Sequence, residues 1–165
     1  MPSLKMARRS ALALFAGVPL LALEPSAARA DSPFATLNGS WAGAGQIKLE
    51  GGNSESLKCR AYYTAKDEGA GLGLAIRCAS ASNKIELRAN LIYAAGKVIG
   101  DWEERQFNAG GSVSGQASGN KINLAITGGG VSGSLTVALS GTTHSVSIQT
   151  TGIGLRAVNI NLSRS

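Results

Sequence analysis

From Ser40 onward, apolar and polar residues alternate along the chain, and short groups of turn residues interrupt the alternation. A period of two is typical of β-strands that bury one face. No stretch of this region shows the apolar spacing of an amphipathic helix. About ten strands are therefore predicted, over residues 40–50, 55–65, 72–80, 84–93, 97–105, 111–118, 121–127, 130–139, 144–151 and 155–164.

The first predicted hairpin contains both cysteines of the chain. A turn at residues 67–70 sets Cys59 opposite Cys78 and Ala61 opposite Ile76. Directly opposed residues in an antiparallel pair lie ~4.5–5.5 Å apart, a distance that a disulfide can span. The cysteines and the apolar pattern favour the same register, so we expect a Cys59–Cys78 disulfide, which suits an oxidising compartment.

Charged residues favour the register of a second hairpin. A turn at residues 95–96 sets Arg88 against Glu103 and Glu86 against Arg105. Opposite charges that face each other across a ladder stabilise that pairing. This match indicates that the two segments are neighbouring antiparallel strands.

Three more turns, at residues 119–120, 128–129 and 141–142, join apolar partners. They pair Ala117 with Ile122, Ile126 with Val131, Ile122 with Leu135, and Val137 with Val146. Strands joined by hairpins form a meander, and closing the meander into a barrel removes its exposed edges. We predict an all-β fold, a single antiparallel up-and-down barrel of about ten strands. A two-sheet sandwich is the alternative, but it usually needs longer crossovers.

Residues 1–30 have the three parts of a secretory signal peptide. Residues 5–9 carry three positive charges, residues 11–23 are mostly apolar, and residues 28–30 match a small-x-small cleavage site. At ~1.5 Å per residue the apolar run is too short to cross a bilayer core of ~30 Å. We expect a periplasmic or secreted protein with one mature domain, residues 31–165. An adjacent pair of arginines leaves the twin-arginine route open beside ordinary secretion.

The expected mature domain is only mildly basic. Removing residues 1–30 takes away four of the 16 basic and one of the 10 acidic residues, which leaves a net charge of +3. No run of Lys and Arg is present, so nucleic-acid binding is not expected. The predicted outer face is rich in Ser, Thr, Asn and Gln rather than apolar, so no transmembrane segment is expected in the mature domain.

Small residues recur at predicted inward positions in mid-strand. These residues are Gly43, Gly45, Gly100, Gly115, Gly133, Ala61, Ala89 and Ala117. Small inward residues either let a barrel flatten onto itself or leave room for a ligand. A filled lumen and a ligand-binding lumen are both consistent with this pattern.

A Gly-x-Trp-x-Gly-x-Gly motif opens the domain, with Gly39, Trp41, Gly43 and Gly45 as its residues. The Gly-x-Trp start resembles that of calycin-type barrels, such as lipocalins and fatty-acid-binding proteins. The longer form is similar to the opening of nitrobindin-like haem barrels. The resemblance implies that Trp41 plugs the barrel floor and that a basic residue of a late strand, here Arg164, packs across it.

Three residues are candidates for ligand binding. His144, the only histidine, is predicted to point inward near a rim. A neutral inward histidine can ligate haem iron, and a hydrogen-bonded rim histidine is the alternative. Trp102 and Glu104 are predicted to point inward at a strand end. No further free metal ligands accompany His144, so a metal site of the usual zinc type is not expected.

Arg60, Arg77 and Arg88 are predicted to lie side by side on the outer faces of three adjacent strands, through a turn at residues 82–83. Adjacent like charges repel one another. The stripe is therefore a candidate site for an anion or an acidic partner. The alternative is a solvated face with local ion pairs.

No catalytic constellation is recognisable, because no nucleophile elbow is present and no acidic residue is near His144 in the sequence. We expect a non-enzymatic binding protein that holds a small hydrophobic molecule in its lumen, with haem as the one candidate cofactor. The alternative is an inhibitor of an exported hydrolase, a protease or lysozyme, that acts through its surface. Leu37-x-Gly39-x-Trp41 also resembles the start of periplasmic metalloprotease inhibitors.

Overall fold

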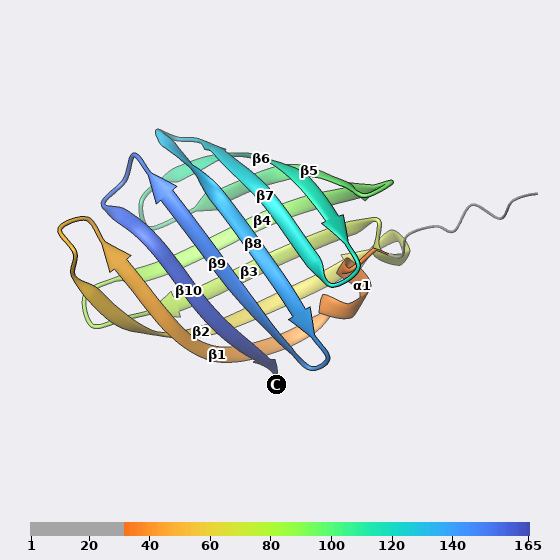
Figure 1. Ribbon diagram of the computed structural model, residues 1–165, viewed down its shortest axis with the longest axis horizontal. Coiled ribbons are helices and arrows are strands. Elements are labelled where there is room, and N and C mark those ends of the chain that lie inside the picture. Colours follow the sequence, from red (N-terminus) through yellow and green to blue (C-terminus); the bar gives the residue numbers. More distant parts are fainter. Residues whose placement is uncertain (1–31) are drawn as a thin grey trace, which may run out of the picture.

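The computed structural model describes residues 32–165, and most of them lie in ten β-strands (Figure 1). The strands are β1 (Gly39–Leu49), β2 (Ser54–Lys66), β3 (Gly71–Ala79), β4 (Lys84–Ala94), β5 (Lys97–Glu104), β6 (Ala109–Ser118), β7 (Lys121–Gly128), β8 (Val131–Ser140), β9 (Thr143–Thr151) and β10 (Leu155–Arg164). Each strand pairs antiparallel with the next, and β1 pairs with β10 to close the barrel. The predicted all-β up-and-down barrel is confirmed. The predicted signal peptide lies outside the described residues.

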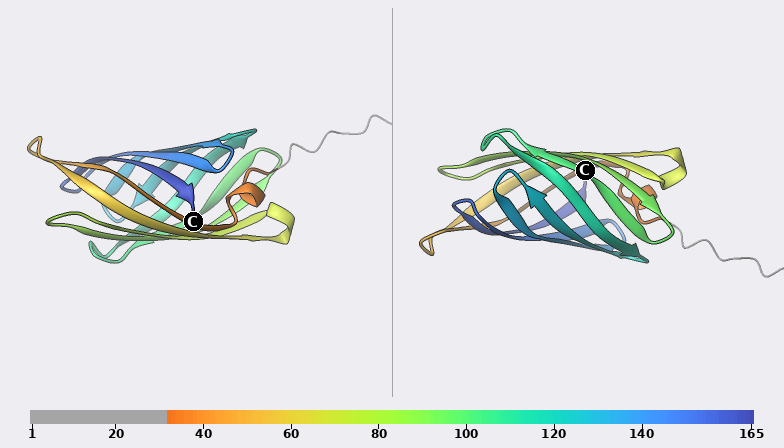
Figure 2. Two further views of the ribbon diagram at one scale, coloured as in Figure 1. Left: turned by 90° about the horizontal axis from the view of Figure 1, so that it is seen from below. Right: turned by 90° about the horizontal axis from the view of Figure 1, so that it is seen from above.

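Two short helical segments were not expected from the sequence. The helix α1 (Phe34–Leu37) precedes β1, and the 3-10 turn η1 (Asp67–Gly69) connects β2 with β3. Figure 2 shows α1, in orange, at the end of the barrel where this connection lies. Phe34 and Leu37 are 0 % and 2 % exposed, so α1 buries its apolar face at this end. A single helical turn is too short to produce a periodic apolar pattern.

The barrel therefore has two different ends. We call the end that α1 covers the closed end, and the opposite one the far end. Among the described residues, the far end carries the turns at residues 50–53, 80–83, 105–108, 129–130 and 152–154. These turns are visible at the left of Figure 1, away from α1.

Most of the predicted registers are confirmed. Cys59 faces Cys78 in the β2–β3 ladder, and the two sulfur atoms form a disulfide. Arg88 faces Glu103 in the β4–β5 ladder. The predicted pairs across β6–β7 and β8–β9 are also present, including Ala117 with Ile122 and Val137 with Val146.

The predicted β3–β4 register is wrong by two residues. Arg77 faces Glu86, and Arg88 faces Ala75 instead of Arg77. The turn consists of residues 81–82, and the backbone N–H of Ser80 donates to the carbonyl oxygen of Asn83. The carboxylate of Glu55 on β2 accepts hydrogen bonds from Ser80 and Ser82, which holds the turn in this position.

The β7–β8 register also differs by two residues from the prediction. Ile126 faces Gly133, not Val131, and Ile122 faces Val137, not Leu135. The turn is formed by Gly129 and Gly130, whose φ angles are +61° and +77°. Two consecutive residues with positive φ suit the tight turn of a hairpin. A shift of two residues keeps every side chain on its face, so the alternation could not exclude it.

The inward glycines serve a different purpose from either one expected. A Cβ at Gly43, Gly115 or Gly133 would lie 1.9–2.1 Å from a carbonyl oxygen of the adjacent strand. Gly45 and Gly100 are equally close to their neighbours, at 2.0 and 2.1 Å. These glycines let neighbouring backbones approach closely where the strands bend around the barrel. They do not leave space in the lumen.

This close approach predicts which glycines tolerate a methyl group. Gly133→Ala should lower the free energy of unfolding by about 1–3 kcal/mol or more, because the new Cβ overlaps the Gln149 carbonyl. Gly154→Ala is the matched control, since nothing lies within 4 Å of its Cβ position. Urea unfolding of both variants measures the difference. Equal midpoints for the two variants would contradict the proposed close approach.

Candidate functional site: an apolar lumen with one sealed end

The inward faces of the strands enclose an apolar cavity of about 130 Å³. Leu87, Leu135 and Ile148 line it and are only half-buried, although their strands are paired on both sides. These side chains therefore leave part of their apolar surface open to the cavity. An apolar cavity of roughly 150 Å³ in a protein core stays dry and accepts benzene or xenon. The lumen thus has room for a small apolar molecule.

The cavity reaches the far end of the barrel, where Trp102, Phe107 and Ile153 border it. Phe107 is 48 % exposed, and Trp102 is half-buried. The indole N–H of Trp102 donates to the carbonyl oxygen of Thr127 at 3.2 Å, which fixes the ring on this rim. Because α1 covers the other end, the far end is the route by which a ligand would enter.

Glu104 also points inward at this rim and is 8 % exposed. One carboxylate oxygen accepts the backbone N–H of Glu86, and the other accepts that of Phe107, both at 2.7 Å. The carboxylate therefore ties the β5–β6 turn to the start of β4. These two hydrogen bonds give Glu104 a structural role at the rim. The sequence had predicted that it contributes to ligand binding.

The closed end is sealed by Trp41 and Arg164, which face each other in the β1–β10 ladder. The Trp41 side chain is 1 % exposed, and its indole N–H donates to the carbonyl oxygen of Leu37 at 2.7 Å. The Arg164 guanidinium lies over the indole ring, 4.5 Å from its centroid. Its nitrogens donate to the carbonyl oxygens of Thr36 and Asn38 at 2.8 and 2.7 Å. Arg164 thus binds α1 and covers Trp41 at the same time.

Gly39 makes this seal possible. Its φ angle is +123°, which side chains rarely adopt, and a Cβ at this position would lie 2.8 Å from a guanidinium nitrogen of Arg164. Gly43 and Gly45 allow β10 to approach β1, so each glycine of the opening motif has a steric reason for having no side chain. All four residues of the motif are therefore architectural.

His144 lies beneath the seal and is 2 % exposed. Its ring packs edge-on against Trp41, with 4.5 Å between centroids, and its Nε2 is 3.0 Å from the hydroxyl of Tyr63. Its Nδ1 has no hydrogen-bond partner among residues 32–165. Burial, assisted by the positive charge of Arg164, lowers the pKa of His144 to about 4. The imidazole is therefore neutral at neutral pH.

This position does not fit haem ligation. His144 is packed between Trp41 and Tyr63 at the closed end, and it is not one of the residues that line the cavity. Ligand pockets for drug-sized molecules have volumes of roughly 300–1,000 Å³, whereas the cavity measures about 130 Å³. The lumen as it stands therefore offers haem neither space nor an axial ligand. Within residues 32–165, no three metal-ligating side chains come together.

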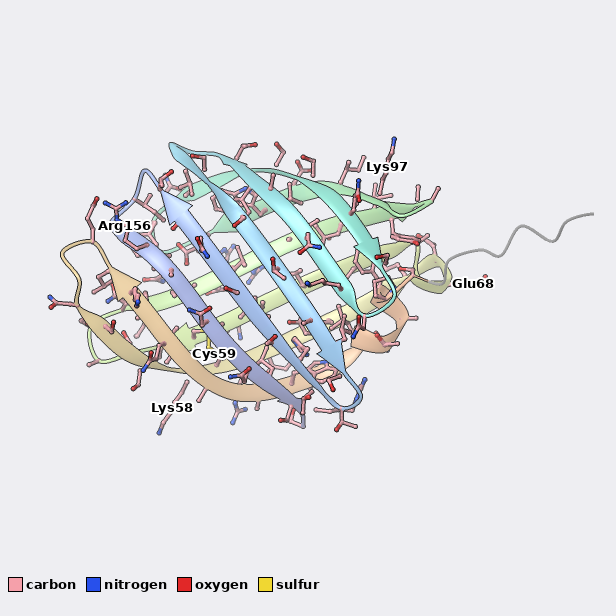
Figure 3. All side chains as sticks on the ribbon, viewed as in Figure 1. Lys58, Cys59, Glu68, Lys97 and Arg156 are labelled. Carbon is pink, nitrogen blue, oxygen red and sulfur yellow. A yellow bond between two sulfur atoms is a disulfide. The ribbon has the colours of Figure 1, made fainter. Side chains whose placement is uncertain are left out.

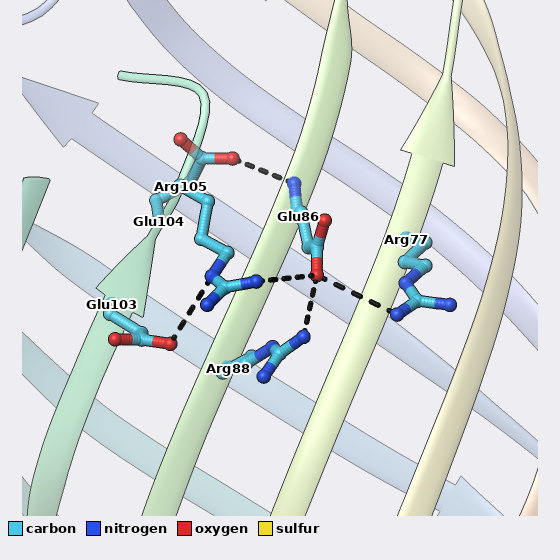
Figure 4. A network of polar contacts seen from close by, with 6 residues as sticks. All are labelled: Arg77, Glu86, Arg88, Glu103, Glu104 and Arg105. Carbon is cyan, nitrogen blue, oxygen red and sulfur yellow. Dashed lines mark hydrogen bonds and ion pairs between the residues drawn. The ribbon is translucent and has the colours of Figure 1, made fainter. Parts of the chain in front are cut away.

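The predicted arginine stripe is interrupted by a carboxylate. Glu86 lies 2.9 Å from Arg88, 3.6 Å from Arg77 and 3.9 Å from Arg105 (Figure 4). The hydrogen bond from Arg88 is the main cause of a lowered pKa for Glu86, and the charges of the other two arginines add to it. Arg77 and Arg88 are thus neighbours of Glu86 and not of each other. Arg60 faces Arg77 across the β2–β3 ladder, as predicted.

The fold and the site together define a ten-stranded barrel with one sealed end and an apolar lumen. Among solved structures, the chain is similar to that in "Crystal Structure of Rv2717c from M. tuberculosis", with a TM-score of 0.61 and 17 % sequence identity. The match covers 81 % of this chain and 98 % of that one, and at this identity it shows a shared fold. No protein-family model matches the sequence, and neither does any curated protein. In the described part of the chain, no helix has the length and apolar character needed to cross a membrane.

The seal predicts energetic coupling between its two main residues. Trp41→Leu removes the aromatic face and Arg164→Ala removes the guanidinium, so the losses in unfolding free energy should overlap by about 0.5–1 kcal/mol. Chemical denaturation of both single variants and the double variant measures this coupling. The control pair is Trp41→Leu with Arg156→Ala, since Arg156 binds Glu50 at the far end. Additive losses for the first pair would contradict the stacking.

The buried imidazole predicts a specific pH dependence. An unfolded chain protonates His144 near pH 6.5, whereas the folded protein protonates it only near pH 4. The unfolding free energy should therefore fall as the pH is lowered from about 6.5 to 4, by about 3 kcal/mol from this group. Above pH 7.5 the group should contribute no slope.

The chain has no other histidine, so the comparison with His144→Gln isolates this effect. The difference between the pH profiles of wild type and variant, each measured by urea unfolding, should contain the predicted slope. NMR titration of the imidazole gives the folded pKa directly. A folded pKa of 6 or above would contradict the burial argument.

Proposed function

We propose that this protein is an exported, non-enzymatic binding protein with a calycin-like barrel, and that it holds a small apolar molecule in its lumen. The observation that carries this proposal is the cavity of about 130 Å³ with half-buried leucine and isoleucine side chains on its wall. When an apolar ligand covers exposed apolar surface inside a closed barrel, the complex is stabilised by ~25 cal/mol per Å² of surface removed from water. The Cys59–Cys78 disulfide is in keeping with an oxidising compartment outside the cytoplasm.

The ligand class follows from the lining of the lumen. Glu104 is the charged side chain on the cavity wall, and two backbone N–H groups already occupy its carboxylate. A charged ligand group would therefore lose its hydration without gaining a free partner. We propose an uncharged ligand of about the size of benzene, or the alkyl end of a longer molecule whose remainder extends past Trp102 and Phe107.

Benzene and n-hexanol are suitable first probes. Methyl NMR signals of Leu87, Leu135 and Ile148 should shift on titration with either probe, because these side chains line the cavity. Leu135→Trp fills the lumen and should weaken binding at least about tenfold. Ile99→Trp is the matched control, since Ile99 is 57 % exposed on the outer wall, and its affinity should not change. Native mass spectrometry of freshly purified protein should reveal any ligand already bound.

Two results would contradict the proposal. One is an absence of methyl shifts in the wild type near the solubility limit of both probes. The other is equal affinity in the two tryptophan variants. Either result would favour the alternative, inhibition of an exported protease or lysozyme through the outer surface. Ile92 and Ile99 support that alternative most, because they face each other across β4 and β5 and are 58 % and 57 % exposed.

A further inference from the structure

The outer wall of β2, β3 and β4 concentrates the positive charge of the domain. Seven of the 12 basic residues beyond residue 30 lie on this wall or next to it. They are Lys58, Arg60, Lys66, Arg77, Lys84, Arg88 and Arg105. Glu86 lies among them, and Asp101 and Glu103 lie on the adjacent strand β5. The wall is thus distinct from the hydroxyl-rich outer face of β6 to β9.

Four of these cations, Lys58, Arg60, Arg77 and Lys84, line a hollow of about 550 Å³ together with one carboxylate, Glu86. Ala79, Cys59 and Cys78 also line it, and Lys58 and Lys84 lie on either side of Ala79 in the two ladders. Two long basic side chains therefore flank a short one on this part of the wall. Figure 3 shows Lys58 pointing away from the barrel at this end.

Arg60 and Arg77 border the same hollow in the next row of the sheet. They are directly opposed, and directly opposed side chains have Cβ atoms ~4.5–5.5 Å apart, so their like charges destabilise the pair. Glu86 lies 3.6 Å from Arg77 but divides its charge among three arginines. Within residues 32–165, Arg60, Lys58 and Lys84 have no ion pair. The hollow thus carries an excess of positive charge that the protein itself does not neutralise.

We propose that this hollow binds a phosphate-bearing group. A guanidinium presents a planar fork of donors that matches phosphate oxygens, and two such forks face one hollow here. A phosphate monoester carries about −1.5 to −2 charges at pH 7, which suits an excess of several cations better than a single carboxylate does. The volume suits one or two phosphate groups, on a soluble ester or on a lipid headgroup.

Calorimetric titration with inorganic pyrophosphate at low ionic strength tests the soluble form of the ligand. The wild type should bind, and added NaCl should weaken binding because the hollow is exposed. Arg60→Gln with Arg77→Gln should weaken binding at least about tenfold. Arg60→Lys with Arg77→Lys keeps the charge but loses the forks, so it should give an intermediate affinity.

Lys97→Gln with Lys121→Gln is the matched control for loss of two charges. Both lysines are exposed and lie outside the hollow, and Figure 3 shows Lys97 at the opposite end of the barrel from Lys58. This variant should bind pyrophosphate within about twofold of the wild type. Melting temperature and the circular dichroism spectrum verify that each variant is folded, and they keep this test independent of the lumen proposal.

Vesicles distinguish the two sources of the phosphate. Co-sedimentation with phosphatidylcholine vesicles that contain phosphatidic acid, compared with phosphatidylcholine alone, tests the headgroup. Binding of pyrophosphate alone assigns a soluble ester, and binding of the acidic vesicles alone assigns a headgroup, provided that the glutamine variant loses it. Binding of neither probe, or equal loss in the glutamine variant and the lysine control, overturns the proposal.

Discussion

The pairing of β1 with β10 is the interaction on which the rest of the structure depends. It converts a meander with two free edges into a closed barrel, and only a closed barrel can enclose a lumen. Gly43 and Gly45 permit this pairing because any side chain would strike the carbonyl groups of β10. At its end, Arg164 reaches back over Trp41 to Asn38, 126 residues earlier in the sequence. The residues of the opening motif therefore take part in closing the barrel.

In the closed barrel, different kinds of side chain occupy different regions. Aromatic and basic side chains fill the closed end, aliphatic side chains line the lumen, and cations gather on the outer wall of β2 to β4. His144 belongs to the first of these regions, where burial lowers its pKa, and it takes no part in the second. A ligand in the lumen would therefore contact mainly aliphatic side chains, and Trp102, Glu104 and Phe107 at the rim. It would not contact His144, which does not line the cavity.

The sequence predicted the strands and the barrel well because alternation and turn residues are local signals. The strand registers could be predicted where a specific pair of residues identified them, such as Cys59 with Cys78 and Arg88 with Glu103. The β3–β4 turn was misplaced because the deciding carboxylate, Glu55, comes from another hairpin. Alternation cannot detect such a shift, since two residues restore the same face.

The candidate site was predicted less completely. The inward direction of His144 and Glu104 followed from alternation, but their neighbours did not. Whether Glu104 meets a ligand or two backbone N–H groups depends on the course of the β5–β6 turn. The glycines could not be interpreted from the pattern either, because the distance between adjacent backbones depends on how strongly each strand bends. The basic hollow likewise depends on the β3–β4 register.

The order in which the strands are made has a consequence for folding. Synthesis proceeds from β1 to β10, so nine strands are complete before β10, the second partner of β1, exists. Until then β1 and β9 each present an unpaired edge, and Trp41 has no guanidinium over it. Loop closure over more than a hundred residues makes this last pairing slow relative to the local hairpins. A sheet of β1 to β9 would therefore expose two strand edges, which favour aggregation, until β10 closes the barrel.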